Sequence, residues 1–149
     1  MISKTLEDYL KKNAIGKEQK GDHANLITTV SKDITQLENY NPKEIQLFRE
    51  VVFRKERLVK GAVDLIALSS EKIILFEMKV IYSLSQNKIL YVRKDIEKQL
   101  TKAHNFFQEN FGINPILIGV YRYTHETDYH HYTMYMKRKQ YLEDMAIAV

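Results

Sequence analysis

The chain contains no cysteine and little proline or glycine, with two prolines and five glycines among its 149 residues. Without cysteine it can form neither a disulfide nor a thiolate metal site. It also has no internal repeat, no low-complexity tract and no linker rich in proline or glycine. We therefore expect a single domain over residues 1–149, a length that can bury one hydrophobic core.

Long apolar runs are absent as well. No stretch reaches the roughly 18 apolar residues of a membrane-spanning helix, and the opening segment MISKTLEDYLKK lacks the apolar stretch of a signal peptide. These absences predict a cytoplasmic protein without membrane contact. Neither glycine-rich nucleotide motif (GxxxxGK[ST] or GxGxxG) occurs, and neither does the serine-hydrolase motif GxSxG.

The charge balance is mildly basic, with 23 Lys and Arg against 19 Asp and Glu, a net charge of +4 and a pI near 9.1. This balance fits a phosphate-rich partner without requiring one. Three basic clusters contain Arg54, Lys55, Arg57 and Lys60; Tyr91, Arg93 and Lys94; and Lys137, Arg138 and Lys139. We expect DNA phosphates to be bound mainly by Lys55, Arg57, Lys60, Arg93 and Lys94. The alternative, for any single cluster, is that its charges contribute only to solubility and bind no DNA.

Hydrophobic periodicity predicts the secondary structure. Helices are expected over 2–12, 31–40 and 95–110, from Asn41-Pro42 to about Phe48, and as a short segment from Tyr141, with a loop at 16–22 and a stop at Gly112. Strands are expected over 51–59, in the GAVDLIAL and KIILFEMKV segments, over 114–123, and at the sheet edge over 130–137. The order helix, three strands, helix, two strands predicts an α/β fold.

The most informative feature is Asp64 on one apolar strand, followed by Glu77-Met78-Lys79 at the end of the next. Alternation along a strand puts Glu77 and Lys79 on one face and Met78 on the other. A hairpin can then bring Asp64 beside Glu77, so that two carboxylates and an amine converge. Such a spot can hold a hard divalent cation and place a lysine next to its bound water. The alternative is the solvated face of a half-buried sheet, which is less natural for Asp64 because aspartate is depleted in strands.

The segments 61–66 (GAVDLI) and 76–79 (FEMK) resemble the core of the PD-(D/E)xK nuclease superfamily, in which the aspartate and the ExK tripeptide lie on adjacent strands. The chain is similar to small archaeal Holliday-junction resolvases and related DNA endonucleases. The likeness covers 61–79 well and 92–109 loosely, and Val63 stands where the family name has proline. It implies a restriction-endonuclease-like core, in which α-helices flank a mixed central β-sheet and one helix crosses over to a parallel strand. It also implies a Mg²⁺- or Mn²⁺-dependent phosphodiesterase, without naming the DNA that is cleaved.

The resemblance also suggests roles for individual residues. Asp64, Glu77 and the Met78 carbonyl would be metal ligands. Lys79 would orient the attacking water, offset transition-state charge or accept a proton. Gln99 and Lys98 fall on the following helix, where family members carry a residue facing the metal, although a solvated helix face is an equal alternative. Some family members add an acidic metal ligand from the first helix, and Glu7, Glu44 and Glu50 are the candidates for it in this chain.

Two other classes of function remain open. The first is a nucleic-acid-binding module that keeps this fold without cleavage, and the second is a protein-interaction domain. Retention of Asp64, Glu77 and Lys79 together favours the enzyme, because a module that only binds has no need of this trio. For an enzyme that cuts two strands symmetrically, a homodimer is the expected assembly.

Overall fold

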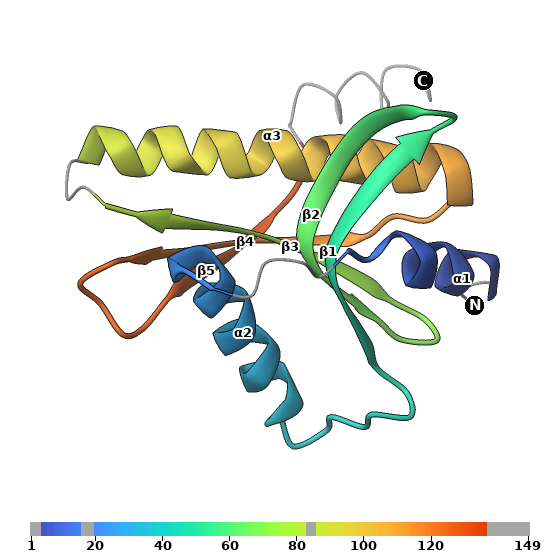
Figure 1. Cartoon of the computed structure of the whole chain (residues 1–149), viewed down its shortest axis with the longest axis horizontal. Coiled ribbons are helices and arrows are strands. Elements are labelled where there is room, and N and C mark those ends of the chain that lie inside the picture. The colour runs from blue at the N-terminus through green and yellow to red at the C-terminus, as the bar shows by residue number, and fades with distance from the viewer. Residues whose placement is uncertain (1–3, 16–19, 83–85, 137–149) are drawn as a thin grey trace, which may run out of the picture.

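A five-stranded mixed sheet organises the chain, with the strand order β1-β2-β3-β4-β5 (Figure 1). The computed structural model describes residues 4–15, 20–82 and 86–136. Its elements are α1 (Lys4–Asn13), α2 (Asp22–Thr35), β1 (Gln46–Lys55), β2 (Leu58–Leu68), β3 (Ile73–Ile81), α3 (Gln86–Phe111), β4 (Ile116–Tyr123) and β5 (His130–Met134).

The pairing of the strands is that of a mixed α/β sheet. β1 with β2 and β2 with β3 form antiparallel hairpins, whereas β3 and β4 pair in parallel and are joined by the 26-residue helix α3. β5 pairs antiparallel with β4 and lies at the edge of the sheet. The structure thus confirms the predicted mixed sheet, the helical crossover to a parallel strand and the edge position of the last strand.

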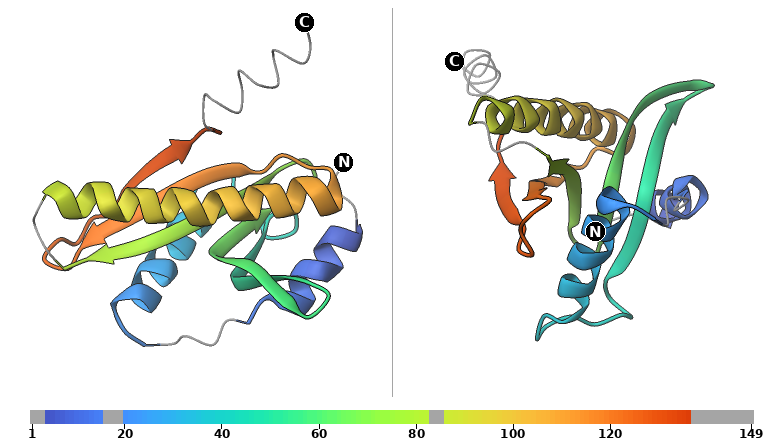
Figure 2. Two further views of the ribbon diagram at one scale, coloured as in Figure 1. Left: turned by 90° about the horizontal axis from the view of Figure 1, so that it is seen from above. Right: turned by 60° about the vertical axis from the view of Figure 1, so that its left-hand side comes forward.

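Helices cover both faces of the sheet, with α3 running along one face and α2 packed against the other (Figures 1 and 2). Alternate residues of a strand point to opposite faces, so neighbouring residues belong to different cores. Ile66 of β2 and Leu75 of β3 pack in the core shared by α3 and α1. Leu65 and Met78 pack against α2 in the second core. The strands β2 and β3, which carry Asp64 and Glu77, are therefore held between two layers of buried apolar side chains.

The predicted helix boundaries in the first third of the chain were wrong. α2 begins at Asp22 and ends at Thr35, instead of covering 31–40. The stretch after Asn41 forms a single turn, in which the Asn41 side chain accepts the Lys43 N–H at 2.9 Å. β1 then begins at Gln46. The Asn41 side chain therefore caps a turn, and the valine and phenylalanine residues that follow favour a strand over a helix.

The predicted strand over 51–59 is instead a hairpin. β1 ends at Lys55 and β2 begins at Leu58, with Glu56 at a φ of 59° in the turn between them. The turn contains none of the Gly, Asn, Asp or Pro residues that normally mark a hairpin, which is why the sequence did not reveal it.

Other sequence predictions hold. α1 matches the first predicted helix, and the helix over 95–110 is present but begins earlier, as α3 from Gln86. Gly112 follows α3 with a φ of 64° and donates its N–H to the Gln108 carbonyl at 3.0 Å, which ends the helix as expected. The edge strand predicted over 130–137 ends earlier, at Met134. Most of the loop at 16–22, residue 137 and the helix predicted from Tyr141 lie outside the described residues. No helix within the described ranges is both long and apolar enough to cross a membrane.

Candidate active site

The candidate site lies where β2 separates from β3. Their antiparallel ladder runs from Leu68 opposite Ile73 to Leu65 opposite Phe76 and stops there. Beyond this point the β1–β2 hairpin curves away from β3 (Figure 1). Asp64 and Glu77 are the next residues on the two strands, so they face each other across the opening.

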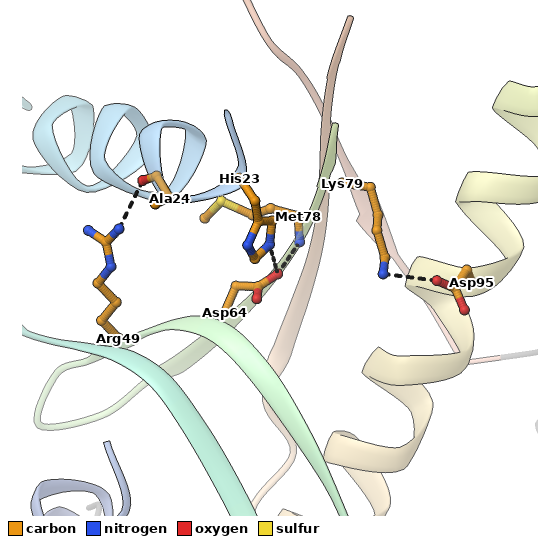
Figure 3. Close-up of polar contacts among 7 residues, drawn as sticks. All are labelled: His23, Ala24, Arg49, Asp64, Met78, Lys79 and Asp95. Carbon is orange, nitrogen blue, oxygen red and sulfur yellow. Dashed lines mark hydrogen bonds and ion pairs between the residues drawn. The ribbon is translucent and has the colours of Figure 1, made fainter. Parts of the chain in front are cut away.

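The Asp64 side chain replaces a backbone hydrogen bond between β2 and β3, because the Met78 N–H lies beyond the end of their ladder and has no β2 carbonyl opposite it. Its Oδ2 accepts a hydrogen bond from the Met78 N–H at 2.8 Å (Figure 3). The N–H and carbonyl of a strand residue project from the same edge, so the Met78 carbonyl is also directed toward the opening. The geometry places the three groups that the sequence suggested as metal ligands around one opening in the sheet.

The Glu77 side chain is buried, with 7% of its surface exposed. Burial, the negative charge of Asp64 and a hydrogen bond shared with Asp64 raise the pKa of Glu77 well above its ordinary value, while the positive charge of Lys79 offsets only part of this rise. Two carboxyl groups forced together in a buried place favour the uptake of a proton or of a cation. The predicted contact between Asp64 and Glu77 is therefore confirmed.

The Lys79 amine forms an ion pair with Asp95 of α3, with Nζ 3.0 Å from Oδ2 (Figure 3). Burial lowers the pKa of Lys79, but the hydrogen bond and charge of Asp95, together with the charges of Glu77 and Asp64, outweigh it and leave this pKa raised. Lys79 therefore stays protonated at neutral pH in the metal-free protein. It is coupled to both carboxyl groups electrostatically and is tethered to α3 by Asp95.

His23 is a further member of the site that the sequence did not reveal. Its Nε2 lies 3.2 Å from Asp64 Oδ2, on the side of β3 that faces α2 (Figure 3). Arg49 of β1 fixes the first turns of α2, donating hydrogen bonds to the Ala24 carbonyl and the Thr28 hydroxyl, each at 2.8 Å. No local signal marks His23, because its partner lies more than forty residues further along the chain.

Of the three open glutamates, Glu50 is the one that the strand register places beside the carboxyl pair. The register of Arg49 opposite Leu65 and Val51 opposite Val63 puts Glu50 across from Asp64, where the pairing is interrupted. Glu50 has a φ of 53°, a left-handed conformation that is uncommon for a residue with a side chain. It sits on a strand rather than on the helix from which an acidic ligand was expected.

The other acidic and helical candidates lie elsewhere. Glu7 forms an ion pair with Lys11 at 2.9 Å and accepts a hydrogen bond from Gln46 at 3.0 Å. Glu44 is exposed in the turn before β1. On α3, Gln99 is half-buried one turn after the residue that binds Lys79, and Lys98 is exposed. No recorded bond joins Gln99 to the site.

The predicted DNA-binding residues fall in two places. Lys55, Arg57 and Lys60 are exposed at the far end of the β1–β2 hairpin. Lys94 is exposed on α3, whereas the Arg93 guanidinium lies over the ring of Tyr132, 4.2 Å from its centroid. The cluster at Lys137 lies outside the described residues.

A cavity of about 430 Å³ lies away from the carboxyl pair, on the α2 face of the sheet. Its lining includes Val30, Phe76 and Val120 and contains neither Asp64 nor Glu77. The candidate site is thus an opening between strands and is separate from this apolar cavity.

Comparisons with known proteins do not assign the chain to a family. No family model matches the chain, and no curated protein matches its sequence. Among solved structures, one described as the crystal structure of SSO0001 is similar over 84% of this chain, with a TM-score of 0.40 and 15% identity. This chain spans 58% of the length of that structure.

Proposed function

We propose that the chain is a divalent-metal-dependent DNA endonuclease of the PD-(D/E)xK superfamily, with a restriction-endonuclease-like core. The observation that carries the proposal is the pair of carboxyl groups, Asp64 and the buried Glu77, at the point where two strands separate. A buried acidic pair is costly for folding, and a protein retains such a pair most readily where it serves a function. Lys79, two residues after Glu77, supplies the nearby positive charge.

The donor groups fit Mg²⁺ or Mn²⁺. Asp64, Glu77 and the Met78 carbonyl offer hard oxygen atoms, and Mg²⁺ needs few protein ligands because it retains several waters. Within the described ranges, no three His, Asp or Glu side chains are grouped to hold a metal ion, so the site relies on this pair and the carbonyl. When bound, the cation would activate a water and offset charge on the phosphoryl group.

The protein's own residues then have separate roles. Asp64 and Glu77 hold the cation, and the hydrogen bond from the Met78 N–H fixes the orientation of Asp64. Lys79 is protonated, which supports its role in offsetting the negative charge that develops on the phosphate. His23 contacts the same Asp64 oxygen as the Met78 N–H and so limits how that carboxylate turns.

One observation favours the second candidate, a module that binds nucleic acid without cutting it. Lys79 is held by Asp95 at 3.0 Å, so in this state its amine is engaged away from the carboxyl pair. The enzyme requires this ion pair to exchange for contacts with the substrate, whereas the binding module does not. Cleavage assays separate the two candidates directly.

The proposal predicts that DNA cleavage depends on added Mg²⁺ or Mn²⁺ and is abolished by EDTA. The test incubates the protein with labelled branched, single-stranded and duplex DNA, with either cation or with EDTA. Cleavage of at least one substrate that requires the cation supports the enzyme. Full cleavage in EDTA would contradict the metal mechanism, and binding without any cleavage would favour the binding module.

A second prediction concerns the exposed end of the β1–β2 hairpin. Replacing Lys55, Arg57 and Lys60 together with alanine should weaken DNA binding for all sequences alike and flatten its dependence on salt, because each phosphate contact releases counterions. Binding is measured over a range of salt concentrations. The matched control is the triple alanine variant of Lys11, Lys12 and Lys32, three exposed lysines on α1 and α2, which should bind DNA like the wild type. Equal affinity and salt slope in the hairpin variant and the wild type would remove the hairpin from the DNA-binding surface.

A further inference from the structure

Tyr132 of β5 reaches across the sheet toward the carboxyl pair. Three residues lie side by side on adjacent strands, because Glu77 is in register with Gly119 of β4, and Gly119 is in register with Tyr132. Side chains at such lateral positions project from the same face of the sheet. Glu77, Gly119 and Tyr132 therefore share the face that α3 covers.

Gly119 has no side chain, and the tyrosine uses the space this leaves. A Cβ atom at Gly119 would lie 2.5 Å from Cζ, 2.6 Å from Cε1 and 2.7 Å from Oη of Tyr132. The hydroxyl end of the ring thus occupies the place of a residue-119 side chain, which is the position next to Glu77. Strands in a sheet are about 4.8 Å apart, so a group in this position is within reach of the Glu77 side chain.

The Tyr132 hydroxyl is buried, and no group among the described residues accepts a hydrogen bond from it, because the neighbouring Arg93 guanidinium can only donate to the hydroxyl oxygen. Arg93 of α3 packs over the face of the ring, 4.2 Å from its centroid, which is a cation–π contact and fixes the ring in place. Burial of a hydroxyl without a partner is unfavourable, and such groups in a folded protein call for an explanation. An ionised carboxylate beside it would supply the missing acceptor.

We propose that Tyr132 is a positioning residue of the metal site, whose hydroxyl donates a hydrogen bond to the Glu77 carboxylate when that carboxylate holds a cation. The inference rests on the proposed function and adds a residue to it. Groups that hydrogen-bond to metal-binding side chains fix the orientation of those side chains, and their loss typically weakens metal affinity by about 10- to 100-fold. Gly119 is then required as well, since any larger residue would displace the end of the ring.

The test is Tyr132→Phe, which keeps the ring and removes only the hydroxyl. We expect it to weaken Mn²⁺ binding, measured by calorimetry, by about 10-fold or more. In cleavage assays the Mg²⁺ concentration for half-maximal rate should rise, while the rate at saturating Mg²⁺ changes less. In EDTA the variant should melt at nearly the same temperature as the wild type, because the hydroxyl proton that is removed has no acceptor in the metal-free protein. Gly119→Ala, which displaces the same hydroxyl, should also weaken Mn²⁺ binding.

Two control variants separate this role from packing. Tyr129→Phe removes a hydroxyl that donates to Asp33 at 2.6 Å, remote from the site on the α2 face, so it should lower the melting temperature and leave Mn²⁺ affinity unchanged. Glu97→Gln alters the α3 carboxylate whose charge acts on Tyr132 and should also leave Mn²⁺ affinity unchanged. If the wild type binds Mn²⁺ and Tyr132→Phe binds it equally well, the role of Tyr132 is overturned and the proposed function stands. If the wild type binds no Mn²⁺, both are overturned.

Discussion

Glu77→Gln is expected to reduce DNA cleavage by roughly a thousandfold or more, because it removes one of the two carboxylates that would hold the cation in the proposed enzyme. The substitution keeps the shape of the side chain and should leave the fold intact. The matched control is Glu44→Gln, which changes an exposed glutamate far from the site and should cleave at the wild-type rate. Cleavage at the wild-type rate by Glu77→Gln would contradict the assignment of this residue.

The same substitution should stabilise the metal-free protein at neutral pH. The pKa of Glu77 is raised in the folded state above its ordinary value of 4.5. At pH values between 4.5 and this raised pKa, the folded protein therefore binds more protons than the unfolded chain. The contribution of Glu77 to the free energy of unfolding therefore falls as pH rises from about 4.5 through the pKa of Glu77 in the folded state. Glu77→Gln should remove this loss, and its melting temperature in EDTA should drop less than that of the wild type between about pH 5 and pH 8. An equal drop in both proteins would show that Glu77 is not buried against Asp64.

Lys79→Ala is expected to lower cleavage by roughly a hundredfold or more, because in the proposed enzyme it removes the positive charge that would lie beside the reacting phosphate. Mn²⁺ affinity should be retained or rise slightly, since the amine repels a bound cation. Stability should change by less than about 1 kcal/mol, because the ion pair with Asp95 is partly exposed. Rates, Mn²⁺ binding and thermal melting are measured together.

The matched control for Lys79 is Asp95→Asn, which keeps the amine but removes its partner on α3. If the ion pair only holds the Lys79 side chain in place until substrate binds, the cleavage rate of this variant should be within about tenfold of the wild-type rate. Wild-type cleavage by Lys79→Ala would remove the lysine from the chemistry. Equal loss in both variants would instead show that the ion pair itself is what cleavage requires.

The part of the site formed by neighbouring strands could be predicted from the sequence. Alternation along KIILFEMKV and the short turn before it suffice to bring Asp64 and Glu77 together, because both are local properties of one hairpin. Asp64 also stood out because aspartate is rare within an apolar strand. The hydrogen bond that explains it, from the Met78 N–H, follows from the separation of the strands.

The rest of the site depends on contacts between residues far apart in the chain. His23 reaches Asp64 from a helix whose start the sequence did not mark, and Arg49 holds that helix in place. Asp95 captures Lys79 across the face covered by α3. Tyr132 depends on the register of two strand pairs and on the absence of a side chain at Gly119. None of these arrangements leaves a periodic or local pattern in the sequence.

The most direct test of the account is calorimetric titration of Mn²⁺ into the metal-free wild type and into Glu77→Gln at neutral pH, with circular dichroism to verify that both are folded. The account predicts binding of Mn²⁺ by the wild type and its loss in Glu77→Gln, since the substitution removes one of the two negative charges that would attract the cation and leaves a weaker amide ligand in its place. Absence of binding by the folded wild type, or equal binding by the two proteins, would contradict it.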